Sequence, residues 1–246
     1  MTLLRLHSVS RSYWRGSNEV VALRDVSLEV DPGEVVAVYG SRNAGKTTLL
    51  RIAAGFEAPD SGTVTFLDRD LASLSRRRLA RLHREQIGWV ERAGPHSTDL
   101  PIRDYLALPL YRELGRREAH RRAVAALERV GAVDCATERW DDLSDSVRML
   151  VAIAHALARE PRLLIIDDPT AGLGVIDREQ ILVLVRSAAE QGGLGVLIAV
   201  PDLPAMLHAS QVRSLSRGKL IGPSGSDGSG ASVVQFPRHR RRPSDR

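Results

Sequence analysis

Cysteine, aromatic residues and lysine are all scarce in this sequence of 246 residues. The single cysteine, Cys135, excludes an internal disulfide and a zinc site built from cysteines. Aromatic residues make up only 4% of the chain, so no aromatic-studded basic surface for nucleic acid is indicated. No run approaches roughly 18 apolar residues, the length that predicts a membrane-spanning helix. The first residues also lack the apolar run and the cleavage site of a signal peptide. These absences favour a protein of a reducing compartment.

Positive charge is in modest excess, with 35 lysines and arginines against 30 acidic residues and a formal charge of +5. Only Lys46 and Lys219 are lysines, so 35 − 2 = 33 of the basic residues are arginines. Residues 223–246 carry five arginines and two aspartates, which places +3 there and leaves 5 − 3 = +2 on the rest. This segment begins with a Gly/Ser-rich stretch and is predicted to be a disordered basic tail, attracted to anionic membrane surfaces. The charge therefore predicts no nucleic-acid partner.

Hydrophobic residues make up 43% of the chain, which is enough for a folded core. Apolar or alternating runs bounded by glycine and proline predict strands, at residues 3–9, 20–23, 26–30, 34–39, 63–67, 87–90, 163–166 and 196–200. Apolar residues at every third or fourth position predict helices, at residues 49–54, 76–84, 176–191 and through most of 100–160. Strands that alternate with helices predict a mainly parallel sheet, here with a helical insert between two sheet-forming segments.

A glycine-rich loop joins the strand at residues 34–39 to a helical run. Its sequence, GSRNAGKTT, matches the phosphate-binding pattern Gly-x4-Gly-Lys-Thr. The glycines let backbone N–H groups surround phosphate oxygens, and the helix adds its positive end. Lys46 would reach the β- and γ-phosphates and Thr47 would ligate Mg²⁺, whereas the alternative is a glycine-rich surface turn. Asn43 replaces a common glycine but tolerates the left-handed conformation. The predicted nucleotide-binding residues here are Gly40, Ser41, Arg42, Asn43, Ala44, Gly45, Lys46, Thr47 and Thr48.

Two acids end the apolar strand LLIIDD at residues 163–168. A carboxylate at a strand end beside a phosphate loop suits a Mg²⁺ ligand, so Asp167 is predicted to share the metal with Thr47. The alternative is an acidic turn after a buried strand.

The ordered motifs resemble the nucleotide-binding subunit of ABC transporters over about residues 2–222. Tyr13 resembles the aromatic residue that stacks on adenine, although it could be an ordinary strand residue. Residues 143–157 resemble the signature sequence and its helix, and residues 104–110 resemble the lipoprotein-release and macrolide-export types. The resemblance implies an α/β P-loop NTPase, an ABC-type ATPase core with a mainly parallel sheet, an N-terminal antiparallel β subdomain and a helical insert at about 92–160. Residues 1–222 would form this domain.

The resemblance also implies ATP and Mg²⁺ as cofactors and a head-to-tail dimer that encloses two ATP molecules. The dimer would be a homodimer or a heterodimer with another ATP-binding subunit, and each site would join one subunit's phosphate loop to the other's signature. The helical insert would contact a membrane permease, which places the chain on the cytoplasmic face of the membrane. Basic stretches at residues 76–78, 116–117 and 121–122 are either solvent-exposed helix faces or contacts with that subunit or with lipid.

Positions that the family uses for hydrolysis are altered in this sequence. The catalytic glutamate falls on Asp168, whose side chain is shorter by one methylene group. The glutamine that senses metal and water falls on Arg92, unless Arg92 is a plain surface residue. The acidic residue of the loop after Asp168 falls on Gly174, and the switch histidine falls on Pro201, which has neither an imidazole nor an N–H group. Each change removes a pre-placed group from the phosphoryl-transfer site.

The signature glycines fall on Asp145 and Ser146, while Ser144 is retained. A carboxylate would then stand where backbone N–H groups meet the partner's γ-phosphate, although the same residues could simply cap a helix beginning near Ser146. Binding residues kept beside altered catalytic residues predict an ATP-binding subunit that hydrolyses slowly. The alternatives are a fully active transport ATPase with Asp168 as the base, and a regulatory nucleotide-binding protein of the same fold.

Overall fold

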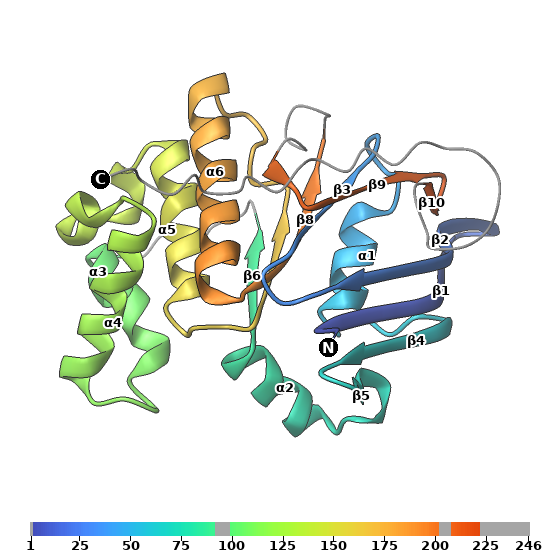
Figure 1. The fold of residues 1–246 in the computed structure, drawn as a ribbon, viewed down its shortest axis with the longest axis horizontal. Coiled ribbons are helices and arrows are strands. Elements are labelled where there is room, and N and C mark those ends of the chain that lie inside the picture. Colours follow the sequence, from blue (N-terminus) through green and yellow to red (C-terminus); the bar gives the residue numbers. More distant parts are fainter. Residues whose placement is uncertain (1, 92–98, 202–207, 222–246) are drawn as a thin grey trace, which may run out of the picture.

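Two β-sheets with helices around them form the part of the chain described by the computed structural model, residues 2–91, 99–201 and 208–221 (Figure 1). The strands are β1 (Leu4–Arg15), β2 (Asn18–Val30), β3 (Val35–Tyr39), β4 (Ser61–Phe66), β5 (Arg69–Asp70), β6 (Ile87–Glu91), β7 (Leu163–Asp167), β8 (Gly195–Val200), β9 (Gln211–Ser216) and β10 (Lys219–Ile221). The α-helices are α1 (Lys46–Ala53), α2 (Arg76–Glu85), α3 (Ile102–Ala107), α4 (Arg116–Arg129), α5 (Asp145–Leu157) and α6 (Val175–Gly192). The predicted tail at residues 223–246 lies outside the described residues.

The larger sheet has the strand order β10-β9-β3-β8-β7-β6. Every neighbouring pair is parallel except β10 with β9, so the predicted mainly parallel sheet is confirmed. Its central strands β3, β7 and β8 are apolar runs because helices or the second sheet cover both of their faces. Strands β9 and β10 were not predicted, because their short sequences QVRSLS and KLI are mixed and only partly buried.

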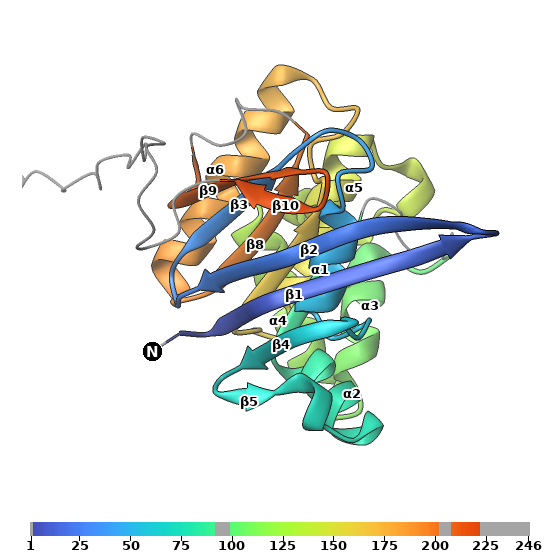
Figure 2. The ribbon, with the colours of Figure 1, turned by 90° about the vertical axis from the view of Figure 1, so that its right-hand side faces the viewer.

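The smaller sheet is antiparallel, with the order β2-β1-β4-β5. Its first two strands form a long hairpin that extends beyond the rest of the sheet (Figure 2). The prediction ended the first strand near residue 9, but β1 continues to Arg15 through three register shifts. These irregularities break the alternation of apolar and polar residues, which is why the sequence pattern stops before the strand does. The N-terminal antiparallel β subdomain is confirmed.

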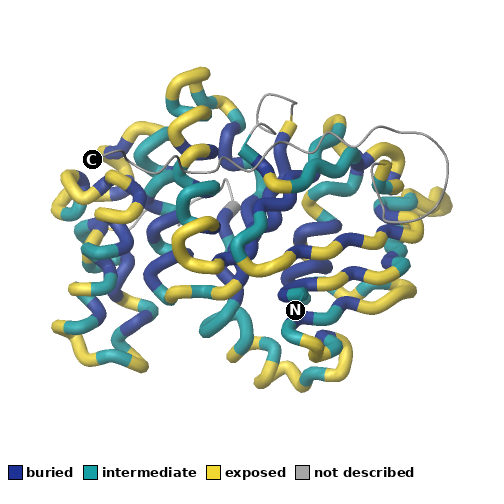
Figure 3. The backbone as a smooth tube through the Cα atoms, in the orientation of Figure 1, coloured by how far each residue is buried: buried dark blue, intermediate teal, exposed yellow. Residues whose placement is uncertain are grey.

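The large sheet separates two hydrophobic cores (Figure 3). Alternate residues of β7 point to opposite sides, with Leu163 and Ile165 in one core and Leu164 and Ile166 in the other. The first core also holds α1 and the inner face of the small sheet. The second holds α3, α4, α5 and α6. Helix α1 therefore lies between the two sheets, on the opposite side of the large sheet from α5.

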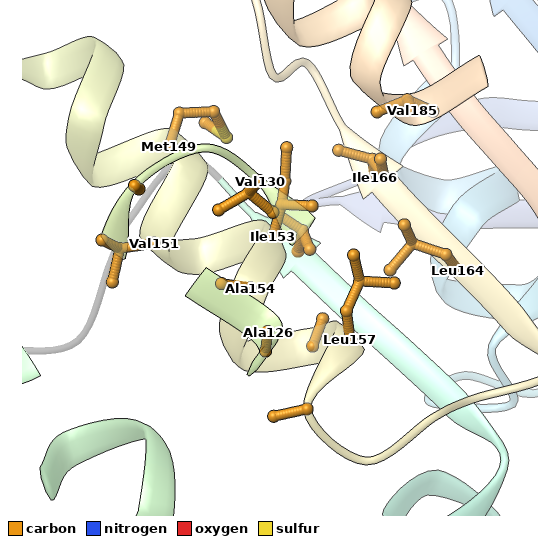
Figure 4. Packing of buried hydrophobic residues seen from close by; sticks show 14 of the residues in the cluster. Ala126, Val130, Met149, Val151, Ile153, Ala154, Leu157, Leu164, Ile166 and Val185 are labelled. Atoms are coloured by element: carbon orange, nitrogen blue, oxygen red, sulfur yellow. The ribbon is translucent and has the colours of Figure 1, made fainter. Parts of the chain in front are cut away.

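Helix α5 is the centre of the second core (Figure 4). Its residues Met149, Ile153 and Leu157 recur at the spacing of one helix face, and they belong to the same buried cluster as Leu164 and Val185. The predicted mostly helical character of residues 100–160 is thus confirmed. Within the described ranges, no helix combines the length and the apolar content needed to cross a bilayer.

His155 on α5 gives a prediction for the pH dependence of stability. Its ring stacks on Tyr105 with the ring centroids 4.9 Å apart. Burial, together with the nearby Arg159 charge, lowers the pKa of His155 to about 4. Because an unfolded histidine titrates near 6.5, the unfolded chain binds the extra proton between about pH 6.5 and pH 4. This contribution to stability is therefore complete above pH 6.5 and is lost as the pH falls toward 4, by about 3 kcal/mol in total.

Urea unfolding at several pH values checks this prediction. The His155→Asn variant should lose part of the decline in unfolding free energy between pH 6.5 and pH 4. The exposed His7 on β1 offers a control, since His7→Asn should leave the decline unchanged. Parallel curves for wild type and His155→Asn would contradict the assignment to His155.

Candidate functional site

The carboxyl ends of three neighbouring parallel strands bring most of the predicted site residues together. Tyr39 at the end of β3 pairs with Val200 of β8, and Asp167 at the end of β7 pairs with Ala199 of β8. Gly40, Asp168 and Pro201 follow these strands directly. In open α/β sheets, ligands bind outside the carboxyl ends of the strands. The fold thus places the predicted phosphate loop and the two acids at the same edge.

The phosphate loop runs from Gly40 to the first turn of α1. Its outer residues Ser41, Arg42 and Asn43 are exposed, whereas Ala44 is buried. Asn43 has φ 64°, the left-handed conformation that its residue type tolerates. The Lys46 ammonium donates to the carbonyl oxygens of Gly40 at 2.6 Å and Ser41 at 3.0 Å. The charge therefore lies over the loop itself, as a phosphate-binding lysine requires.

Both glycines of the motif are required by close contacts with other strands. A Cβ atom on Gly40 would lie 2.3 Å from the carbonyl oxygen of Leu215 in β9. A Cβ atom on Gly45 would lie 2.2 Å from the carbonyl oxygen of Ala22 in β2, and Gly45 has φ 105°. The loop is thus fixed between the two sheets, with its N–H groups and the start of α1 available to an anion. The residues present fit a chain of phosphate groups.

The two predicted metal residues are in direct contact. The Thr47 hydroxyl in the first turn of α1 donates to Oδ2 of Asp167 at 2.7 Å, across 120 positions of sequence. A hydroxyl and a carboxylate are oxygen ligands of the kind that Mg²⁺ prefers, and Mg²⁺ usually adds phosphate oxygens and water to one or two protein ligands. The donor set beside the phosphate loop therefore fits a Mg²⁺ ion.

Asp168 follows the predicted metal residue Asp167 and has an unusual backbone conformation. It has φ 52°, and its N–H group donates to the carbonyl oxygen of Ala199 at 3.0 Å. One of its carboxylate oxygens, Oδ1, is buried. Pro201 is exposed at the end of β8, and Gly174 is an exposed N-cap of α6 with open space around it. Arg92, the other altered position, lies outside the described residues.

The signature-like residues lie at the start of α5, which packs in a different core from helix α1. Ser144 is the N-cap of α5 and its hydroxyl accepts a long hydrogen bond of 3.4 Å from the Val147 N–H group. This confirms that a helix cap is present, with Ser144 as the capping residue. Asp145 is highly exposed and Ser146 half-buried. Helices α5 and α1 lie on opposite sides of the large sheet (Figure 1), so within one chain the sheet separates the helix that carries these residues from the helix that follows the loop.

Tyr13 has partners that the sequence did not identify. Its hydroxyl donates to Glu57 at 2.7 Å and lies 3.4 Å from the Thr48 hydroxyl on α1. The guanidinium of Arg11 lies 5.0 Å from the ring centroid. Arg11 could have been noticed, since residues two apart on a strand share a face. Glu57 gives no local signal because it lies in the connection between α1 and β4.

Comparisons with known proteins agree with this geometry. Residues 23–171 match the sequence family described as "ABC transporter". The macrolide export ATP-binding/permease protein MacB of Burkholderia pseudomallei (strain K96243) is 33% identical over 223 residues, which cover 89% of this chain and 34% of that protein. The lipoprotein-releasing system ATP-binding protein LolD of Shewanella denitrificans is 34% identical over 202 residues, which cover 81% of this chain and 86% of that protein. The chain thus spans about a third of the length of the MacB relatives it matches.

Solved structures show the same fold. A dimeric ATP-binding cassette in a post-hydrolysis state, bound to ADP and Pi, has a TM-score of 0.80 and 26% identity, and the match covers 88% of this chain and 96% of that one. A second structure, cbiO1 from Clostridium perfringens, described as part of an ABC transporter complex, has a TM-score of 0.80 and 26% identity. That match covers 89% of this chain and 87% of the other.

Proposed function

This chain belongs to the ABC transporter family, and from that membership we propose that it is the ATP-binding subunit of a membrane transport complex. The observation that carries the proposal is the cluster of Lys46, Thr47 and Asp167 at the carboxyl edge of the large sheet. These side chains come from two distant segments of the sequence, and they lie beside the glycine loop. Such an arrangement suits a nucleotide with a chain of phosphates and a divalent cation.

In the proposed complex, the loop binds the phosphates of ATP and Lys46 neutralises part of their charge. Thr47 and Asp167 would hold Mg²⁺, which supplies charge neutralisation between the phosphates when it is bound. Tyr13 offers an aromatic surface for the base, since its hydroxyl lies close to Thr48 at the start of α1. Each of these roles belongs to binding rather than to bond cleavage.

We further propose that hydrolysis by the isolated chain is slow. Asp168 would have to orient the attacking water with a carboxylate that reaches about 1 Å less far than glutamate, and a misplacement of that size can cost about 10²-fold in rate. Pro201 offers neither an imidazole nor an N–H group to the γ-phosphate. Gly174 has no side chain to contribute. Hydrolysis would be faster if a partner subunit supplied the groups that are missing at Pro201 and Gly174.

A second ATP-binding subunit is the proposed partner at the nucleotide. The exposed loop residues Ser41, Arg42 and Asn43 leave the phosphates open to water unless another chain covers them. The signature-like residues of that chain would approach across the interface. If that chain is a second copy, its Asp145 carboxylate at about 4 Å from a phosphate charge costs about 1 kcal/mol in water and about 4 kcal/mol at an effective dielectric of 20. A homodimer would have this cost at both sites, whereas a heterodimer with an intact partner would have it at one, which favours a heterodimer.

The helical part of the chain is the proposed contact with a permease. An open groove of about 670 Å³ lies between α3 and α4, and Arg103, Arg117 and Arg121 line it together with Asp104 and Glu128. Such a mixed-charge groove suits a polar segment of another subunit. We propose that residues 1–222 form the ATP-binding domain, with the helical part at about 92–160, and that the permease holds it at the inner face of the membrane.

Calorimetric titration with MgATP, together with phosphate release, tests the proposed function. Lys46→Ala removes a charge-assisted contact with phosphate that contributes about 1.5–3 kcal/mol, so ATP affinity should fall by about 10- to 100-fold. Lys219→Ala is a matched control, because Lys219 is the other lysine of the chain and lies exposed on β10. Wild-type turnover should stay below about 1 s⁻¹. Faster turnover that is lost in Lys46→Ala would overturn the proposed slow hydrolysis, and an absence of ATP binding would overturn the function itself.

A further inference from the structure

A charged network from two segments of the chain contacts the hydroxyl and one face of the Tyr13 ring. Glu57 Oε1 accepts hydrogen bonds from the Tyr13 hydroxyl at 2.7 Å and from Arg11 Nε at 2.9 Å. The other end of Arg11 pairs with Asp60 at 2.5 Å. Asp60 also accepts from the Ser12 N–H group at 2.7 Å. The two acids come from the connection between α1 and β4, so the network ties the middle of β1 to the segment that leaves the phosphate-loop helix.

The local backbone explains how these groups meet. The pairing of β1 with β2 shifts register between Val9 and Arg11 and again between Arg11 and Ser12. Such irregularities re-aim side chains within a strand. At these register shifts, Arg11 lies over one face of the Tyr13 ring, and its guanidinium carbon is 5.0 Å from the ring centroid. A cation over the face of an aromatic ring is attracted by the negative ring face.

The network is charged and only partly accessible to water. The Arg11 and Glu57 side chains are 27% and 19% exposed, in contrast with 52% and 53% for the surface pair Arg5–Glu29 on the same sheet. The Ser12 N–H group, and then Arg11, hold the pKa of the Asp60 carboxyl below its usual value. Hydrogen bonds to ionised groups are stronger than neutral ones. The ring therefore has a hydroxyl fixed by Glu57 and one face covered by Arg11.

We propose that Glu57 and Arg11 are positioning residues that hold Tyr13 in place as the stacking surface for the nucleotide base. This inference rests on the proposed nucleotide-binding function. Arg11 covers one face of the ring, so the base stacks on the other. A ring that is already immobile does not lose side-chain freedom when the base arrives, which saves about 0.5–1.5 kcal/mol and corresponds to about two- to tenfold in affinity.

A comparison of two ligands separates positioning from general stability. MgATP has both a base and phosphates, whereas inorganic tripolyphosphate with Mg²⁺ has phosphates alone. Glu57→Ala should weaken MgATP binding by about two- to tenfold and leave tripolyphosphate binding unchanged. Glu57→Gln keeps an oxygen acceptor for the Tyr13 hydroxyl and should recover most of the ATP affinity. Glu29→Ala breaks the Arg5–Glu29 pair elsewhere on β1 and β2, and as a matched control it should alter neither ligand.

A double-mutant cycle with Tyr13→Ala completes the test. Once Tyr13 is removed, Glu57→Ala should have no further effect on MgATP affinity, because its action passes through the ring. Equal losses for both ligands, or losses that add to those of Tyr13→Ala, would overturn the positioning role and leave the proposed function intact. If Tyr13→Ala itself leaves ATP affinity unchanged, the positioning role is also wrong. A wild-type chain that binds neither ligand would overturn both proposals.

Arg11→Ala provides an independent variant if Glu57→Ala does not fold. It removes the cation from the ring face and one partner of Glu57, so it should also weaken MgATP and spare tripolyphosphate. Thermal unfolding of every variant, measured without ligand, shows whether each is folded at the titration temperature. A folded Arg11→Ala variant with wild-type affinity for MgATP would count against the proposal.

Discussion

Replacing Asp168 by glutamate is expected to raise the rate of ATP hydrolysis by on the order of 10²-fold. Asp168 follows the proposed metal residue Asp167 at the end of β7, and its N–H group donates to the carbonyl oxygen of Ala199 on the neighbouring strand at 3.0 Å. This hydrogen bond holds the backbone of residue 168 beside β8, so a longer side chain places the carboxylate farther from the strand end. Glutamate adds one methylene group, which restores about 1 Å of reach toward an attacking water.

The backbone of residue 168 sets the cost of this substitution. Asp168 has φ 52°, a conformation that aspartate adopts more easily than most residues. Glutamate should therefore lower the free energy of unfolding by about 1 kcal/mol while it raises turnover. Opposite changes in stability and activity would distinguish a repaired catalytic group from a general improvement of the fold.

Phosphate release under saturating MgATP measures the effect, with Asp168→Asn as the control. The asparagine variant keeps the size and the backbone preference but cannot accept a proton. If hydrolysis by the wild type is slow because of the short side chain, Asp168→Asn should change little and Asp168→Glu should gain. The opposite pattern, no gain with glutamate and a loss of activity with asparagine, would show that Asp168 already serves as the base of an active ATPase.

The sequence predicted correctly that two candidate site residues from distant segments lie close together. Thr47 and Asp167 were both predicted as Mg²⁺ residues, and the structure joins them at 2.7 Å. Their proximity could be predicted because a glycine loop and an acidic strand end each mark the carboxyl end of a parallel strand, and such ends converge. Their role as Mg²⁺ ligands stays a prediction. The partners of Tyr13 were not predicted. Glu57 reaches the ring through the three-dimensional course of a connection, for which no periodic pattern exists.

Strands with a clear apolar pattern in the sequence were predicted, whereas a strand without such a pattern was missed. The buried strands β3, β7 and β8 were predicted almost to their ends because both of their faces must be apolar. Strand β9 was missed because it carries polar residues and only Leu215 in it is buried. Yet Leu215 contributes the carbonyl oxygen that leaves no room for a side chain at Gly40. Strand β9, which was not predicted, thus gives the physical reason for the glycine at position 40 of the motif.

Gly45→Ala is expected to weaken MgATP binding by more than about 10²-fold. Gly45 has φ 105°, and an alanine there has backbone strain of about 1–3 kcal/mol. Its Cβ atom would also lie 2.2 Å from the carbonyl oxygen of Ala22, so either the loop or β2 must move. Movement of the loop misdirects N–H groups whose hydrogen bonds to phosphate contribute about 1.5–3 kcal/mol each. The loss of two such hydrogen bonds, about 3–6 kcal/mol, exceeds the roughly 2.8 kcal/mol that corresponds to about 10²-fold in affinity.

Gly131→Ala is the control that separates strain from the clash. Gly131 has φ 70° at the end of α4, and no atom lies within 4 Å of a Cβ atom built there. Alanine at this position should lower the free energy of unfolding by about 1 kcal/mol and leave ATP affinity unchanged. Calorimetric titration of both variants, with thermal unfolding beside it, measures the two effects separately. ATP affinity within about threefold of wild type in a folded Gly45→Ala variant would show that the loop can bind phosphate without its contact to β2. The glycine would then serve the backbone of the loop alone, and the small sheet would have no part in fixing the phosphate site.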